Sequence, residues 1–356
     1  MDFKNFDSII DARTPSEYAL DHIPGAVNAP VLDDAERAQV GALYKQVSPF
    51  EAKKVGGALV AKNVAHHLET IFKDARKDWK PLVYCWRGGK RSGAMAHILR
   101  EVGWDAQTLS GGYRAYRRWV VQQLEERPFA FRFHVIHGPT GSGKSRFLAA
   151  LARAGAQVLD LEALAAHRGS VLGGLPHRPQ PSQKWFESQL LARLRELDPA
   201  QPVYVEGESK KIGQVQVPEA LMSLMRASPC VVLDTALDTR IELLLQEYEH
   251  FTLDRGALEA QLDCLVPLHG REQIAQWKSL AARGDWRSFV ARLLVEHYDP
   301  AYARSSTRNF VRLAEAPRLH IEHADDAAFD AAARELLGVQ PGKDANMLHG
   351  AAAERA

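Results

Sequence analysis

Residues 81–92 read Pro-Leu-Val-Tyr-Cys-Trp-Arg-Gly-Gly-Lys-Arg-Ser, an apolar run that ends at Cys85 and passes into a basic, glycine-rich turn. The run favours a buried strand, and the helical spacing of apolar side chains from Met95 to Val102 predicts a helix downstream. Cys85 therefore lies where backbone N–H groups and a helix N-terminus can converge on an anion over its sulfur. Inert core packing is the alternative for any cysteine, but a basic loop favours a reactive thiolate. The expected anion-binding residues around catalytic Cys85 are Arg87, Gly88, Gly89, Lys90, Arg91 and Ser92.

Motifs on both sides of this loop have a familiar order. Residues 11–18 read Asp-Ala-Arg-Thr-Pro-Ser-Glu-Tyr, residues 22–28 read His-Ile-Pro-Gly-Ala-Val-Asn, and residues 109–112, Leu-Ser-Gly-Gly, precede Trp119. Together they resemble the opening and closing signatures of rhodanese-type sulfurtransferases, which implies an N-terminal rhodanese-like domain. The spacing from Cys85 to Arg91 is one residue longer than in most single-domain sulfurtransferases. The longer loop also occurs in rhodanese-like phosphatases.

Composition limits the class of protein. The length of 356 residues predicts two domains. With 45 basic and 44 acidic side chains, the net charge of the whole molecule is too small to attract nucleic acid, so any such binding must come from a local basic surface. Three cysteines without C-x-x-C or zinc spacing indicate a reducing compartment, most simply the cytoplasm. Neither a signal peptide nor a membrane-spanning run is expected.

A second motif lies at residues 138–145, Gly-Pro-Thr-Gly-Ser-Gly-Lys-Ser, between an apolar strand pattern and a helical one. This is the G-x-x-x-x-G-K-[ST] phosphate-binding pattern in its required context, and a merely structural turn would need neither the lysine nor the serine. The expected phosphate-binding residues are Gly138, Thr140, Gly141, Ser142, Gly143, Lys144 and Ser145, with the Ser145 hydroxyl as a candidate Mg²⁺ ligand. No other metal ligand is certain.

The second half of the chain alternates strand and helix patterns, which predicts a P-loop NTPase-like domain with a mostly parallel sheet. Strands are expected at 157–161, 202–206, 230–234 and 319–322, and a last helix at 326–337. Asp160, Glu206 with Glu208, and Asp234 are candidates for a metal-supporting carboxylate, and Cys230 and Cys264 are expected in the core. The helix-breaking segment 125–128 predicts domains at 1–127 and 128–338, with a loosely ordered tail at 339–356.

Local basic segments are candidates for an RNA surface. A helix after Gly112 carries arginines on its polar side, and the loop 167–179 is basic and rich in glycine. A solvated face and a plain linker are the simpler alternatives. The candidate tRNA contacts are Arg114, Arg117, Arg168 and Arg178, together with Arg87 and Lys90 of the cysteine loop, on a face expected to be shared by the two domains.

Two further motifs follow the P-loop: Asp160-Leu-Glu162 leads to His167-Arg-Gly-Ser170, and residues 206–213 read Glu-Gly-Glu-Ser-Lys-Lys-Ile-Gly. Together with the rhodanese-like domain and the P-loop, they make nearly the whole chain similar to the tRNA 2-selenouridine synthase family. The resemblance implies geranylation of the sulfur of wobble 2-thiouridine in tRNA from geranyl diphosphate, then replacement of that sulfur by selenium from selenophosphate. It implies Cys85 as the essential cysteine and an enzyme supplying selenophosphate as a partner. Whether Cys85 carries a perselenide or serves a later displacement stays open.

Two other enzymatic functions fit the motifs. One is a rhodanese sulfurtransferase coupled to an ATP-dependent kinase without an RNA substrate. The other is a phosphatase that uses the longer cysteine loop, although the additional cations Arg87 and Lys90 and the lack of an obvious general acid weaken it. A non-enzymatic RNA-binding module would need neither loop.

Overall fold

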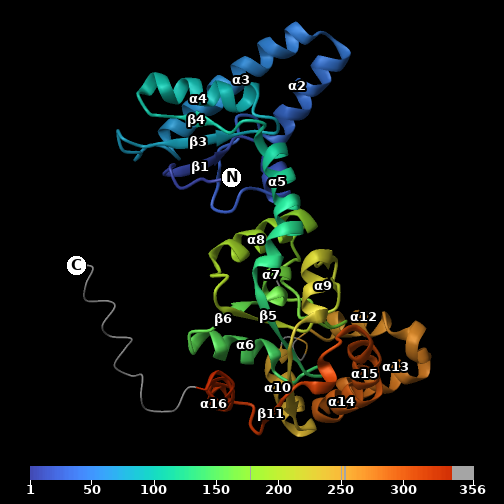
Figure 1. Ribbon diagram of the computed structural model, residues 1–356. Coiled ribbons are helices and arrows are strands. Elements are labelled where there is room, and N and C mark those ends of the chain that lie inside the picture. The colour runs from blue at the N-terminus through green and yellow to red at the C-terminus, as the bar shows by residue number, and fades with distance from the viewer. Residues whose placement is uncertain (177, 250, 252–253, 339–356) are drawn as a thin grey trace. The chain divides into compact units, whose positions relative to one another are not determined.

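The computed structural model describes residues 1–176, 178–249, 251 and 254–338 (Figure 1). The chain divides into two compact units, one made of residues 1–126 and 181–192, the other of residues 127–180 and the chain from 193 onward. Each unit has a parallel sheet with helices packed on it, so the predicted α/β fold class is confirmed. The return of residues 181–192 to the first unit was not predicted. The expected loose tail, 339–356, lies outside the described residues.

The first unit has a four-stranded parallel sheet in the order β2-β1-β3-β4. Its core joins Ile10 and Val83 of the sheet to Met95 and Leu99 of the helix after the cysteine loop. The elements are β1 (Ser8–Asp11), α1 (Pro15–Leu20), β2 (Val27–Asn28), α2 (Asp34–Gln46), α3 (Pro49–Glu69), β3 (Pro81–Tyr84), α4 (Lys90–Val102), β4 (Gln107–Thr108) and α5 (Gly112–Glu126).

Local sequence signals set several of these boundaries. Thr14 caps α1 in a reciprocal capping box with Glu17, and the Ser48 side chain accepts from the N–H of Glu51 at the start of α3. At the other end of a helix, Gly103 adopts the left-handed conformation that ends α4. These hydrogen bonds satisfy backbone N–H groups at the starts of α1 and α3.

The second unit has a five-stranded parallel sheet in the order β11-β10-β5-β7-β6, with β5 in the middle. Phe147 of α6 and Phe329 of α16 pack on it against Ile136 and Leu233. The expected strand at 157–161 ends at Leu159 because Asp160 caps the next helix. The strands and their short connections are η1 (Arg127–Ala130), β5 (Arg132–His137), β6 (Gln157–Leu159), β7 (Pro202–Glu206), β8 (Lys211–Ile212), β9 (Val215–Gln216), β10 (Cys230–Thr235) and β11 (Arg318–Ile321).

Helices beyond β10 form a separate layer around Trp277, Leu262 and Leu294. Cys264 forms the C-cap of α12 and is exposed, so its predicted core position is wrong. Cys230 is buried as expected. The helices of this unit and the shared α8 are α6 (Lys144–Arg153), α7 (Leu161–Ala165), α8 (Gln183–Glu196), α9 (Glu219–Ala227), α10 (Leu237–Glu247), α12 (Arg255–Asp263), α13 (Val266–Ala282, kinked at Gly270), α14 (Trp286–Leu293), η2 (Leu294–Tyr298), α15 (Asp299–Asn309), η3 (Leu313–Glu315) and α16 (Asp326–Leu337).

Candidate functional site

The cysteine loop is held between two helices of the first unit. β3 is buried along its whole length and ends next to Cys85, and α4 begins five residues later at Lys90. The N–H of Tyr113, in the first turn of α5, donates to the Cys85 carbonyl at 2.8 Å. Gly88 has φ +67°, and a Cβ there would lie 2.5 Å from the Leu109 carbonyl oxygen. The loop therefore depends on glycine for its close packing against the segment before α5.

Donors surround the buried thiol of Cys85. The Ser92 hydroxyl lies 3.2 Å from Sγ. Burial alone would raise the pKa of Cys85, but hydrogen bonds from the Ser92 hydroxyl and from the backbone N–H groups of Ser92, Gly89 and Arg87 outweigh it and lower the pKa. The lowered pKa favours the nucleophilic thiolate.

The cations of this loop act differently from the expectation. Arg91 forms an ion pair with Glu17 at 2.6 Å, and the side chains of Arg87 and Lys90 are exposed. The groups that stabilise the thiolate are therefore N–H and O–H donors, while the exposed cations are available to a ligand. Of the three cations expected to add positive charge at the cysteine, Arg91 is thus held by Glu17, and the contribution of Arg87 and Lys90 stays a prediction.

The Asp-Ala-Arg motif near the N-terminus is a structural cluster beneath this loop. Arg13 and Asp11 are almost completely buried and form a salt bridge at 2.6 Å. The Arg13 guanidinium lies 4.0 Å from the ring centroid of Tyr113, whose hydroxyl donates to Asp21 at 2.7 Å. The Arg13–Asp11 pair is complete, and the Tyr113–Asp21 hydrogen bond ties the start of α5 to the same cluster, beside the cysteine loop.

The phosphate-binding motif of the second unit wraps from β5 into α6. Gly143 precedes α6 in a left-handed conformation, φ +82°, and no side chain caps the helix, so its first N–H groups face the loop. The Lys144 ammonium lies 3.3 Å from the Gly138 carbonyl oxygen. Arg240 donates to the Thr140 carbonyl at 3.0 Å and thereby supports the loop from α10.

Carboxylates gather on the far side of this loop. The Ser145 hydroxyl donates to Glu162 at 2.8 Å, and Glu206 accepts from the N–H of Glu162 at 2.6 Å. Burial, and then the Glu162 charge, raise the pKa of Glu208 to about 8, so it is largely protonated at neutral pH. Burial, followed by the charges of Asp160 and Glu162, also raises the pKa of Glu206.

The structure separates the four acidic candidates named from the sequence. Glu208 lines the cavity next to the phosphate loop, and Glu206 is buried behind it. Asp160 caps α7, and exposed Asp234 faces His320 at 3.8 Å on the neighbouring strand. Glu162 also lines the cavity, although the sequence indicated it only as part of the Asp160-Leu-Glu162 motif after a strand.

These groups suit Mg²⁺ only with help from water or substrate. The Ser145 hydroxyl and the Glu162 carboxylate provide hard oxygen ligands, which Mg²⁺ prefers together with phosphate oxygens. No group of three or more His, Cys, Asp or Glu side chains within the described residues could hold a metal ion. A bound diphosphate would therefore have to supply part of the coordination.

A cavity of about 400 Å³ adjoins the phosphate loop. It is lined by Gly138, Thr140, Gly141, Gly143, Lys144 and Ser145, and on the opposite side by the segment 168–171 and by residues of α10 and η2. Arg168 reaches into it, with its guanidinium donating to the Glu247 carbonyl and lying 4.7 Å from the ring centroid of Tyr248. Ser142, although part of the motif, is buried beneath the loop.

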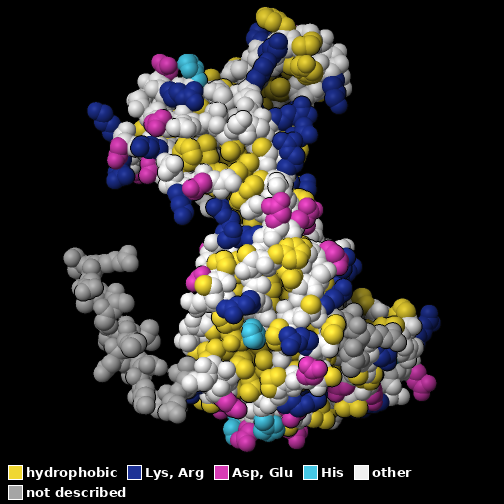
Figure 2. All heavy atoms as spheres, viewed as in Figure 1, with side chains coloured by type: hydrophobic (Ala, Val, Ile, Leu, Met, Phe, Trp, Pro, Cys, Tyr) yellow, Lys and Arg dark blue, Asp and Glu magenta, His cyan; other side chains and the backbone are white. Residues whose placement is uncertain are grey.

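The remaining basic candidates differ in exposure. The Arg114 and Arg178 side chains are exposed. Arg117 is half-buried and paired with Glu187 of the returning segment 181–192, so it supports the first unit. Lys and Arg side chains are interspersed with Asp and Glu over the visible face of both units (Figure 2), in line with the balanced net charge.

The chain thus combines, in two units, a cysteine loop with a lowered thiol pKa and a loop with the phosphate-binding pattern, and each loop follows an interior strand of a parallel sheet. The model of the rhodanese-like domain family matches residues 1–118, and that of the tRNA 2-selenouridine synthase AAA domain matches residues 131–263. The chain belongs to the tRNA 2-selenouridine synthase family, as its motifs predicted.

The relatives are similar over different lengths. The tRNA 2-selenouridine synthase of Nitrosomonas europaea is 38% identical over 244 residues, which cover 67% of this chain and 63% of that protein, just under two thirds of its length. The enzyme of the same name from Marinobacter nauticus is 36% identical over 329 residues, covering 84% of this chain and 88% of that protein. No helix in the described part of the chain is both long and apolar enough to cross a membrane.

Proposed function

We propose that this protein converts wobble 2-thiouridine in tRNA to 2-selenouridine in two steps, first geranylating the sulfur and then replacing it with selenium. The observation that supports this most directly is the combination, in one chain of this family, of a hydrogen-bonded Cys85 thiol with an intact phosphate loop at Gly138–Ser145. Each loop suits one anionic co-substrate.

The first step uses geranyl diphosphate. The thiouridine sulfur forms a bond to C1 of the geranyl group, the C1–O bond breaks, and diphosphate leaves with the electron pair. The base loses its N3 proton, so the product is a neutral thioether. Lys144, which lines the cavity, and the uncapped N–H groups of α6 would stabilise the departing diphosphate. Mg²⁺ held through Ser145 and Glu162 would add further positive charge.

The second step uses selenophosphate. The Cys85 thiolate attacks C2 of the geranylated base, the C2–S bond breaks, and the geranyl group leaves as a thiol after taking up a proton. The selenium of selenophosphate then bonds to C2 as the bond from Cys85 breaks, and water cleaves the P–Se bond to release phosphate. No oxidant is needed. A perselenide on Cys85 would require one, because the selenium of selenophosphate is already at the selenide level.

The partners follow from these steps. tRNA would be held by local cations, with Arg87, Lys90, Arg114 and Arg178 as the exposed candidates and Arg168 at the phosphate cavity. An enzyme that makes selenophosphate would supply the second co-substrate. Three free cysteines fit the reducing cytoplasm, which is also where tRNA is found.

The direct test is to incubate the purified chain with tRNA carrying 2-thiouridine, first with geranyl diphosphate and then with selenophosphate. Nucleoside mass spectrometry should show S-geranyl-2-thiouridine first and 2-selenouridine after it. A sulfurtransferase coupled to a kinase would instead consume ATP and leave the tRNA nucleosides unchanged. Release of phosphate from a chromogenic phosphate ester, with no change in the tRNA, would favour the phosphatase alternative.

A further inference from the structure

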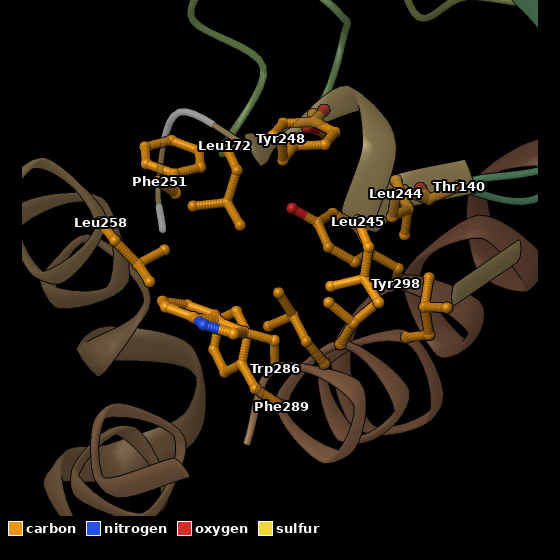
Figure 3. Close-up of a pocket in the computed structure, with 14 residues that line it drawn as sticks. Thr140, Leu172, Leu244, Leu245, Tyr248, Phe251, Leu258, Trp286, Phe289 and Tyr298 are labelled. Atoms are coloured by element: carbon orange, nitrogen blue, oxygen red, sulfur yellow. The ribbon is translucent and has the colours of Figure 1, made fainter. Parts of the chain in front are cut away.

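A second cavity of the same unit lies beside the phosphate loop and is lined almost entirely by hydrocarbon. Leucines and aromatic rings of α10, α12, α14 and η2 form its walls, with Leu172 closing one side. Figure 3 shows the side chains of Leu258, Trp286, Phe289 and Tyr248 pointing toward one common centre. The cavity is narrow, about 50 Å³, compared with about 400 Å³ for the phosphate cavity.

The two cavities adjoin each other and share part of their lining. Thr140, Ser170, Leu244, Tyr248 and Tyr298 line both of them. Thr140 belongs to the phosphate loop itself, so a molecule whose phosphates are held there can extend directly into the apolar cavity. In Figure 3, Trp286 and Phe289 lie across the cavity from Thr140, at the position that the far end of such a molecule would reach.

The walls indicate which kind of molecule fits. A nucleotide base carries several donors and acceptors, and burying them among leucine and aromatic side chains would leave them without hydrogen bonds. A hydrocarbon chain has no such groups and gains from leaving water. A narrow space also admits a flexible chain more readily than a fused ring system.

We infer that the phosphate loop and the adjoining apolar cavity form one site for a prenyl diphosphate, with the diphosphate at Lys144 and the hydrocarbon chain between α10, α12 and α14, where Trp286 limits its length. This inference rests on the proposed function and deepens it, because it places the geranyl chain and assigns the selectivity for chain length. It also explains why a layer of helices covers this side of the phosphate loop.

The decisive comparison uses two valines five residues apart, Val290 in α14 and Val295 in η2. Val290 is half-buried and lines the apolar cavity, whereas Val295 is 52% exposed and does not line it. Geranyl diphosphate and inorganic diphosphate are titrated separately into the full chain without tRNA. The wild-type protein should bind geranyl diphosphate roughly 100-fold more tightly than inorganic diphosphate, because several carbons leave water.

Val290→Phe fills the cavity, so it should reduce the affinity for geranyl diphosphate by roughly 10-fold or more and leave that for inorganic diphosphate unchanged. Val295→Phe, the same change on the surface, should alter neither affinity. Equal behaviour of the two variants would overturn the inference, as would wild-type protein that binds the two ligands equally well.

A second variant covers the case in which Val290→Phe disturbs the phosphate loop. Trp286→Ala should raise the ratio of kcat/KM for farnesyl over geranyl diphosphate in tRNA alkylation roughly 10-fold or more, and a loss of folded protein cannot change such a ratio. An unchanged ratio would count against the assignment of Trp286. If tRNA is alkylated and neither Val290→Phe nor Trp286→Ala changes that reaction, the inference is refuted and the proposed function stands. If Val290→Phe weakens the binding of geranyl diphosphate but no tRNA is alkylated, the proposed function is refuted and the inference stands.

Discussion

Cys85 and Ser92 form the contact on which the selenium step is expected to depend. The Ser92 hydroxyl and three backbone N–H groups favour the thiolate, and these donors would stay in place if only the sulfur were changed. Cys85→Ser should therefore lower selenium incorporation by roughly 1,000-fold or more, with the melting temperature and tRNA affinity nearly unchanged. Nucleoside mass spectrometry measures the loss. Cys264→Ser, an exposed position, is the matched control and should keep full activity. Selenouridine formed by Cys85→Ser at the wild-type rate would contradict the assignment.

Lys144 is the residue expected to separate the two proposed half-reactions. Its ammonium is placed to neutralise a departing diphosphate, and no diphosphate leaves in the selenium step. Lys144→Ala should reduce geranylation by roughly 100- to 1,000-fold. It should still make selenouridine from tRNA that already carries geranylated 2-thiouridine, a reaction in which Cys85→Ser should fail. Equal loss of both half-reactions with unchanged tRNA affinity would argue against this division and favour the kinase alternative.

The Glu208 carboxyl is expected to make diphosphate binding depend on pH. The pKa of its carboxyl is raised to about 8 from 4.5, mainly by burial and then by Glu162, so at pH 7 it is largely neutral and does not repel a diphosphate. As the pH rises through about 8 it ionises, and diphosphate affinity should fall about three- to tenfold between pH 7 and 9 in metal-free buffer. The protonated Glu208 carboxyl also contributes to the free energy of unfolding. This contribution is present in full below about pH 4.5 and is lost as the pH rises through about 8.

Glu208→Gln is the control for the titration of the ligand itself. The amide cannot ionise, so the affinity of Glu208→Gln for diphosphate should change with pH only because diphosphate itself titrates. The difference between the affinity curves of the two proteins then gives the effect of the Glu208 carboxyl. Isothermal titration at several pH values measures both. Parallel curves for the wild-type protein and Glu208→Gln would show that this carboxyl does not control binding.

At the level of helices and strands, the sequence was most informative where a local signal sets the geometry. The apolar spacing from Met95 to Val102 identified α4, and the pattern at 138–145 identified a strand, a loop and a helix together. The apolar cavity could not be predicted, because periodicity assigns Trp286 and Phe289 to a helix but not to an enclosed space. The partners of Glu162 and Arg91 were also missed, since each depends on the relative placement of distant elements.

The cysteine loop provides a test of local backbone geometry with two adjacent glycines. Gly88 has φ +67° and no room for a Cβ beside the Leu109 carbonyl, whereas Gly89 has φ −105° and open space around it. Gly88→Ala should destabilise the first unit by about 1–3 kcal/mol and slow the alkylation of Cys85 by iodoacetamide. Gly89→Ala should have little effect on either. Thermal unfolding and the rate of thiol labelling measure the two outcomes, and similar results for both variants would contradict the geometry.

At the scale of the whole molecule, composition predicted two units and a local binding surface for RNA. It could not predict that residues 181–192 return to the first unit, because this depends on contacts such as the stacking of Trp185 on His22 at 3.9 Å between ring centroids. The same return pairs Arg117 with Glu187. One of the arginines that the sequence proposed for tRNA is therefore held within the fold, while its neighbour Arg114 remains exposed.

This difference determines how tRNA binding should respond to salt and to mutation. With 45 basic and 44 acidic side chains, affinity must come from a local set of phosphate contacts, so log K should fall linearly with log salt. Arg114→Gln should weaken tRNA binding about two- to fivefold and make the slope of log K against log salt shallower by about one unit, as expected for one lost phosphate contact. The melting temperature should be unchanged. Arg117→Gln should instead lower the melting temperature, because it leaves the half-buried Glu187 carboxylate without its cationic partner. Lys62→Gln, an exposed change on α3 outside the candidate set, is the control for a loss of net charge. Fluorescence anisotropy with labelled tRNA at several salt concentrations measures the slopes, and binding that is independent of salt would refute the electrostatic surface.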